Sequence, residues 1–232
     1  MNLAETYEAA GLMDNAIEQY MMAVETDPKM AEAQVQLGSA FAARGDFEKA
    51  LPYLQSAVQL NRNNMLAWHT LADCQVELGQ YRSAQQSYNM VLRLNPNESD
   101  AHVGVGVAFH HLKRYKDAEM SYAQALEVSN YTNHLAYYNL SSTLFAQQRS
   151  AEALQALRKT VELEPDFAHA HLDIALSLLE GTEAASQGSG IGGSGRVQVP
   201  VEEVTEHLRK AISLDPSLIE RVPKAYHKYV AA

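Results

Sequence analysis

The residues whose types could do chemistry in this chain are nine histidines and a single cysteine, and their spacing does not favour a reactive site. His110 and His111 are adjacent, so they cannot place both imidazoles on one face of a helix to hold a metal ion. The same holds for His169 and His171, which lie two positions apart. Cys74 stands alone among apolar residues, so it can form no internal disulfide and is expected to be buried. We therefore expect no metal site and an inert cysteine.

A glycine triplet, Gly190, Gly192 and Gly195, has the G-x-G-x-x-G spacing of phosphate-binding loops. Such a loop works between a strand and a helix, and no strand is predicted before this one. Arg196 and Val197 follow Gly195, where the other common phosphate-binding loop needs a lysine and a hydroxyl. The G-x-S-x-G turn that presents a nucleophilic serine does not occur in the sequence. We predict that the chain is not an enzyme and binds no cofactor.

Composition indicates a folded protein that is not expected to bind nucleic acid or to insert into a membrane. The 232 residues are 47% hydrophobic and 20% charged, which is ordinary for a folded domain. The formal net charge of −10 would repel a phosphate backbone. No apolar run approaches the ~20 residues of a membrane helix, and the first residues lack the apolar core of a secretion signal. We expect a cytoplasmic chain, with the nucleus or the cilium as alternatives, that is not secreted.

A sequence pattern of about 34 residues recurs along the chain. It combines a large residue followed by a small one, an aromatic residue, a later alanine and a proline at the end. The pair occurs as Leu3-Ala4, Leu37-Gly38, Leu71-Ala72, Val105-Gly106, Leu140-Ser141 and Ile174-Ala175. Apolar residues at helical spacing predict two amphipathic helices in each unit, and the small residue lets the partner helix approach closely. Proline ends most units because it cannot continue a helix. Each unit is therefore predicted to be an antiparallel helix pair.

The third unit matches the repeated pattern most completely, with Trp68, Leu71-Ala72, Ala84, Tyr88 and Pro96. The pattern resembles the tetratricopeptide repeat (TPR) family, whose W-x2-L-G-x2-Y, A-x3-F and terminal proline signature covers nearly the whole chain. The resemblance implies an all-α fold, a right-handed superhelical solenoid forming a single domain over 1–232. The repeats are expected at 1–30, 31–64, 65–98, 99–133, 134–167 and 168–217. A Gly-rich loop at 182–199 is expected in the last repeat, and a C-terminal capping helix at 218–231.

In the resembling family, the first helices of successive units line a concave groove that binds extended or helical peptides. The first helices expected here contain no Lys or Arg and lie at 1–10, 31–43, 65–78, 99–112, 134–148 and 168–180. They carry the acids Glu5, Glu8, Glu32, Asp73, Glu77, Asp100, Asp173 and Glu180. The helix dipole explains part of this bias, because it favours acids early and bases late in a helix. A groove of this kind predicts a partner segment that is apolar with Lys or Arg.

The groove residues expected from this division are His69, Asp73, Glu77, Val103, Val107, His110, Tyr138 and Phe145. The carboxylate clamp of chaperone-binding members needs Lys, Arg and Asn, but Glu5, Ser39, His69 and Asp73 stand at the corresponding places. The asparagine ladder of long arrays is matched by Asn139 alone. Most of the histidines also lie in first helices, namely His69, His102, His110, His111, His134, His169 and His171. We do not expect a pH switch from them, because abundance does not make a bistable element.

The resemblance implies a non-catalytic scaffold or adaptor that binds a protein or peptide as a subunit of a larger assembly. Two alternatives stay open. The chain is the regulatory or substrate-recruiting array of a larger enzyme, or it is a structural solenoid that self-associates as a homo-oligomer. The first unit lacks the leading residues of its first helix, so the array either starts with a shortened helix or continues a longer one.

Overall fold

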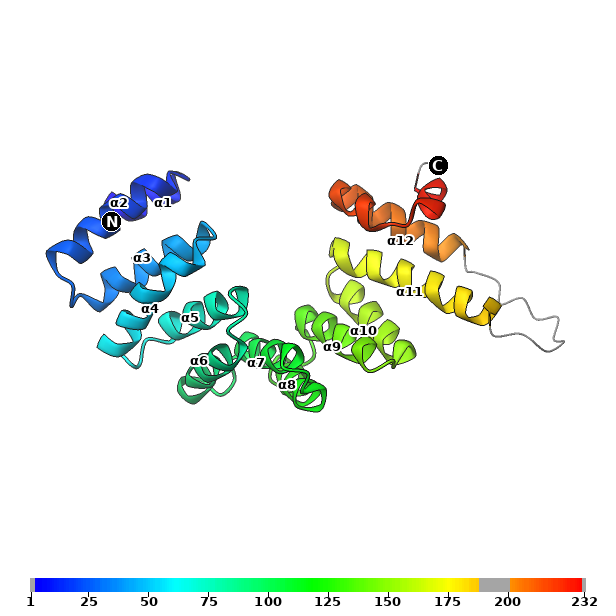
Figure 1. Cartoon of the computed structure of the whole chain (residues 1–232), viewed down its shortest axis with the longest axis horizontal. Helices are drawn as coiled ribbons and strands as arrows, with labels where there is room; N and C mark the ends of the chain where they lie inside the picture. The colour runs from blue at the N-terminus through cyan, green and yellow to red at the C-terminus, as the bar shows by residue number, and fades with distance from the viewer. Residues whose placement is uncertain (1–2, 188–200, 231–232) are drawn as a thin grey trace. The chain divides into compact units, whose positions relative to one another are not determined.

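The computed structural model describes residues 3–187 and 201–230, and helices with short turns make up this described part, without a strand (Figure 1). The first helices of the repeats are α1 (Leu3–Ala9), α3 (Ala31–Ala43), α5 (Met65–Glu77), α7 (Ser99–His111), α9 (His134–Ala146) and α11 (Ala168–Gln187). The second helices are α2 (Met13–Thr26), α4 (Phe47–Leu60), α6 (Tyr81–Leu94), α8 (Tyr115–Val128), α10 (Ser150–Leu163) and α12 (Val201–Leu214). The predicted all-α fold of repeated helix pairs is confirmed.

In the first five pairs, the turn between the two helices contains a residue in the left-handed region. Gly11, Gly45 and Gly79 have φ of +74°, +84° and +69° in the first three pairs. Lys113 and Gln148 take the same conformation in the fourth and fifth pairs, with φ of 59° and 63°. A left-handed residue lets the chain leave one helix and reverse direction, and glycine adopts it without steric cost. Gly45 and Gly79 thus separate the two helices of the second and third pairs.

The small residue of the repeated pair permits close packing of the two helices. A Cβ atom at Gly38 would lie 2.6 Å from Cγ of Leu54, and one at Gly106 would lie 2.4 Å from a ring carbon of Tyr122. Both distances are below van der Waals contact, so a larger residue would push the helices apart. Leu54 is fully buried and Tyr122 is 1% exposed, so these pairs form the centre of their repeats.

The chain divides into two compact units, residues 1–129 and 130–232. The first unit contains the four pairs from α1 to α8. The second contains the pairs α9–α10 and α11–α12 and two short 3-10 helices, η1 (Pro216–Arg221) and η2 (Lys224–Tyr229). Each unit has the expected stacked pairs, and the superhelical course of one domain over the whole chain stays a prediction.

Two expected boundaries in the last repeat differ from the structure. Helix α11 continues past Thr182 to Gln187, because the residues before Gly188 are mostly helix-compatible and include no proline. The rest of the expected loop at 182–199, including the glycine triplet, lies outside the described residues. The capping segment expected as one helix at 218–231 consists of η1 and η2, because Pro223 lacks an N–H and holds Val222 extended at φ −81° and ψ 123°. Leu218 and Val222 are nevertheless buried against the last helix pair.

Candidate functional site

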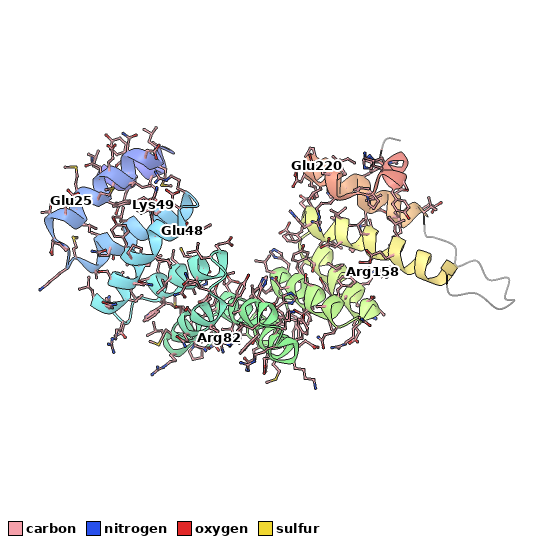
Figure 2. All side chains as sticks on the ribbon, viewed as in Figure 1. Glu25, Glu48, Lys49, Arg82, Arg158 and Glu220 are labelled. Carbon is pink, nitrogen blue, oxygen red and sulfur yellow. The ribbon has the colours of Figure 1, made fainter. Side chains whose placement is uncertain are left out.

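Charge is divided between first and second helices as the sequence indicates. Over the bounds given above, the first helices α1, α3, α5, α7, α9 and α11 contain no Lys or Arg. Second helices carry bases, and Figure 2 labels three of them, Lys49 on α4, Arg82 on α6 and Arg158 on α10. The acidic residues of the first helices therefore have no Lys or Arg on their own helices. A lysine or arginine beside them must come from another element or from a partner.

In the first unit, Asp73 of α5 is held by two neighbouring side chains. The Tyr88 hydroxyl on α6 donates to one carboxylate oxygen at 2.5 Å, and Nδ1 of His69 donates to the other at 3.1 Å. Burial, followed by the charge of Asp73, raises the pKa of Tyr88. The hydrogen bond to Asp73 also raises the pKa of His69. Asp73 is therefore a fixed carboxylate whose two oxygens both have internal donors.

Glu77 lies one turn after Asp73 on α5, and its side chain is exposed. Within the described ranges Glu77 takes part in no ion pair, so it is available to a ligand in a way that Asp73 is not. A similar internal pair occurs earlier in the unit, where the Tyr20 hydroxyl donates to Glu8 at 3.0 Å. Burial and then this hydrogen bond raise the pKa of Tyr20 to about 12.

The other expected groove residues of the first unit differ in how much surface they offer. Val103 is 7% exposed, so it belongs to the core, whereas Val107 is half-buried. The His110 ring lies edge-on to Tyr115 at 5.7 Å between ring centroids, and burial lowers the pKa of His110. His111 stacks on Tyr81 at 4.3 Å with an interplanar angle of 1°. These aromatic contacts tie the end of α7 to the starts of α6 and α8.

In the second unit, Tyr138 and Phe145 both lie on α9 and are half-buried. The Tyr138 hydroxyl donates to Asp173 of α11 at 3.0 Å, and its ring lies edge-on to Phe167 at 4.9 Å. Burial, followed by the charge of Asp173, raises the pKa of Tyr138. Phe145 packs against the core of its own unit.

The predicted groove residues are thus divided between the two units. Those from His69 to His110 belong to the first unit, and Tyr138 and Phe145 belong to the second. The structure joins His69 to Asp73 and leaves Glu77 exposed on the next turn. The sequence placed Asp173 among the first-helix acids but did not predict its contact with Tyr138, because Asp173 belongs to the next repeat. Phe167, at the end of the same repeat as Tyr138, was not singled out.

One contact at the joints between repeats was also missed by the sequence. The contact recurs at the same repeat position in helices α3, α5, α7 and α11. There a side-chain N–H donates to the carbonyl oxygen of the residue six positions earlier, in the turn that ends the preceding repeat. The donors and acceptors are Gln34 to Pro28 at 3.0 Å, Trp68 to Arg62 at 2.9 Å, His102 to Pro96 at 2.9 Å and His171 to Pro165 at 2.9 Å. A carbonyl can only accept, so Nε2 carries the proton in both histidines. These histidines therefore hold a joint between repeats.

His171 also forms a close pair with His207 of α12. Their Nδ1 atoms are 2.7 Å apart. Because Nε2 of neutral His171 carries its proton, its Nδ1 accepts and Nδ1 of His207 donates. Burial, followed by the charge of His171, lowers the pKa of His207. Among the described residues no group of three or more His, Cys, Asp or Glu is arranged to hold a metal ion.

Comparisons with known proteins agree with this architecture. Three family models described as tetratricopeptide repeat match residues 1–64, 41–104 and 98–165. The human Protein O-mannosyl-transferase TMTC3 is 27% identical over 154 residues, covering 60% of this chain and 17% of that protein. Anaphase-promoting complex subunit 3 of Schizosaccharomyces pombe is 24% identical over 149 residues, covering 64% of this chain and 22% of that protein. The chain therefore matches only a small part of the length of these relatives.

The solved structure of the APC/C hetero-tetramer Cut9-Hcn1 superposes with a TM-score of 0.70 at 16% identity. The match covers 99% of this chain and 41% of that chain. At this identity the likeness concerns the fold alone. No helix in residues 3–187 and 201–230 is long and apolar enough to cross a bilayer. The repeated helix pairs and the three matching family models show that the chain belongs to the tetratricopeptide repeat family.

Proposed function

We propose that this chain is a non-catalytic interaction scaffold whose first-helix surface binds an apolar and basic segment of a partner protein. The single observation that carries the proposal is the absence of Lys and Arg from the first helices, which carry several carboxylates. Such a surface attracts a basic segment electrostatically, and the half-buried apolar side chains beside it offer area for apolar contact. Membership of the TPR family supports the scaffold role. The match to a subunit of the anaphase-promoting complex supports assembly into a larger complex.

The carboxylate that best tests this proposal is Glu77. Its side chain is exposed and forms no hydrogen bond within the described part of the chain, so its replacement leaves the Tyr88 and His69 contacts of Asp73 intact. Glu25 provides a matched control, because it is an exposed glutamate of the same unit on second helix α2 (Figure 2). Glu77→Lys and Glu25→Lys change the net charge by the same amount, so only their positions differ.

The experiment selects peptides from a random display library against the purified chain. We expect selected peptides to combine Lys or Arg with apolar residues. For a peptide chosen in this way, Glu77→Lys should weaken binding about fivefold or more at low salt, because it replaces an attraction by a repulsion. Glu25→Lys should leave binding within about twofold, since a distant exposed charge is screened. Selection of acidic or uncharged peptides, or equal binding by both variants, would contradict the proposal.

A second candidate is that this chain is the recruiting array of a larger enzyme. The similarity to a relative named as a mannosyl-transferase, of which the match covers 17%, favours this candidate. An immunoblot of the source with antibodies against this chain separates the two functions. A species of 25.6 kDa supports the scaffold, and detection only at a much larger mass supports the array of an enzyme.

A further inference from the structure

Asp173 in the second unit is a first-helix carboxylate with a guanidinium beside it. The Arg221 guanidinium lies in η1, after the last repeat, and donates to Oδ1 of Asp173 at 3.1 Å. Because α11 contains no Lys or Arg, this cation reaches the first-helix surface from another part of the chain. The C-terminal segment thus supplies the type of side chain that the acidic first helices lack.

The surroundings of Asp173 suit a guanidinium group. The Tyr138 hydroxyl donates to Oδ2 of Asp173 and leaves Oδ1 for the cation. This bond fixes the carboxylate, whose side chain is 22% exposed. The ring of Tyr138, whose hydroxyl contacts Asp173, lies edge to face with the ring of Phe167, and aromatic surfaces favour arginine. A partly buried carboxylate with adjoining rings therefore provides both the charge and the apolar surface that an arginine side chain uses.

Arg221 is held less firmly than the segment that carries it. Its side chain is 47% exposed, and exposed ion pairs contribute little to stability. The segment is anchored instead by Leu218 and Val222, which are 4% and 3% exposed in the core of the last repeat. Arg221 can therefore leave Asp173 while these two apolar anchors stay in place.

We propose that Asp173 and Tyr138, with Phe167 packed against the Tyr138 ring, form a binding site for an arginine side chain of a partner protein, and that Arg221 holds Asp173 in the free chain. This inference rests on the proposed function and adds a residue-specific site and its internal competitor. Because Arg221 is tethered, it competes at a high effective concentration. The affinity for a partner is lowered by the fraction of chains in which Arg221 holds the site. Displacement of Arg221 is the step that opens the site.

The test uses the full chain in which the phenylalanines are replaced by 4-fluorophenylalanine, and fluorine NMR follows the signal at position 167. The chain has five phenylalanines, so the spectrum contains few signals. The probe is the tripeptide acetyl-Gly-Arg-Gly-amide, with acetyl-Gly-Gln-Gly-amide as its uncharged match. We expect Arg221→Gln to bind the arginine tripeptide about fivefold more tightly than the unmodified chain, because the internal competitor is gone. Neither protein should bind the glutamine tripeptide.

Two further variants separate a binding site from a structural ion pair. Asp173→Asn also frees Arg221 but removes the carboxylate, so it should not bind the arginine tripeptide. Lys224→Gln removes a neighbouring exposed cation of η2 and should bind like the unmodified chain. If Arg221→Gln and Asp173→Asn give the same result, the ion pair is only structural and the proposal is wrong. Equal binding by Arg221→Gln and the unmodified chain overturns it as well.

A competition in the unmodified chain keeps the proposal testable if Arg221→Gln does not fold. High concentrations of the arginine tripeptide should shift the Phe167 signal, and the glutamine tripeptide should not. The absence of this difference overturns the proposal. The Glu77 experiment concerns the first unit and does not involve the C-terminal segment, so the two tests fail independently.

Discussion

The hydroxyl of Tyr88 donates a 2.5 Å hydrogen bond to Asp73, and the Tyr88 ring fills the space that a side chain at Gly104 would need. A single residue of α6 thus links the first helix of its own repeat to the first helix of the next. Tyr88 is 5% exposed, whereas the side chain of Asp73 is 51% exposed, so the hydrogen bond joins the packed interior of the first unit to its surface. It places one carboxylate of the proposed binding surface in a fixed position.

We predict that Tyr88→Phe lowers the free energy of unfolding by about 1 kcal/mol, the usual contribution of one hydrogen bond. The ring packing is retained, so the loss reports the bond to Asp73. Tyr53→Phe is the control, because it makes the same chemical change to a half-buried tyrosine of the first unit for which the described residues show no hydroxyl bond. Urea unfolding followed by the fluorescence of Trp68, the sole tryptophan, measures both variants. Equal effects in both would count against a role for the Tyr88 hydroxyl.

Gly104→Ala should destabilise the first unit, although alanine in place of glycine usually favours a helix by about 1 kcal/mol. The added Cβ would lie 2.2 Å from a Tyr88 ring carbon, so the ring or helix α7 must move, at a cost of about 1–3 kcal/mol. Tyr88→Leu should reduce this cost in the double variant, because leucine lacks the ring atoms that collide. Urea unfolding of the single and double variants gives the coupling, and additive effects would refute the proposed collision.

The sequence predicted the helix pairs because their causes are local. Glycine at the turns, proline at the ends and a small residue opposite a large one each act within a single repeat. The need for glycine at position 104 was not predictable in this way, since it arises from Tyr88 of the preceding repeat. Arg221 was missed because it lies beyond the repeated pattern, where spacing gives no guide to which first helix it reaches.

The histidines of the first helices show the same limit. Periodicity places His102 and His171 on first helices, but it assigns them no role there. It does not show the carbonyl groups of Pro96 and Pro165, to which their Nε2 atoms donate. The corresponding residue is Trp68 in the third repeat and Gln34 in the second, and all of these side chains can donate from an N–H. The signal that could have identified the contact is this shared donor property at one repeat position.

We predict that His102→Gln is tolerated and that His102→Leu is not. Glutamine can donate to the Pro96 carbonyl, as Gln34 does to the Pro28 carbonyl at 3.0 Å. Leucine has no donor, so it should lower the free energy of unfolding by about 1 kcal/mol relative to glutamine. Urea unfolding monitored through Trp68 gives the comparison. If the leucine variant is as stable as the glutamine variant, the hydrogen bond at this joint has no measurable role.

The titration of His207 should make the last repeat less stable in acid. Burial and the charge of His171 lower its pKa in the folded chain, so the unfolded chain binds the proton first as the pH falls below the ordinary value of ~6.5. Stability from this group is therefore present above pH ~6.5 and is lost as the pH falls from there toward the lowered pKa. Glu203 and Glu206 oppose the shift, and Arg158 adds to it.

Hydrogen exchange of the α11 and α12 amides at pH 5.5 and 7.5, corrected for intrinsic rates, measures this effect. The unmodified chain should lose protection at the lower pH, and His207→Gln should lose less.

His69 in the first unit should show the opposite pH dependence, because the Asp73 hydrogen bond raises its pKa. Its contribution is present below pH ~6.5 and disappears as the pH rises through the raised pKa, so His69→Gln should destabilise α5 more at pH 5.5 than at 7.5. His69 has the carboxylate of Asp73 as its partner, whereas His207 has the imidazole of His171. If stability changed with pH in the same direction in both variants, these assigned hydrogen bonds would be contradicted.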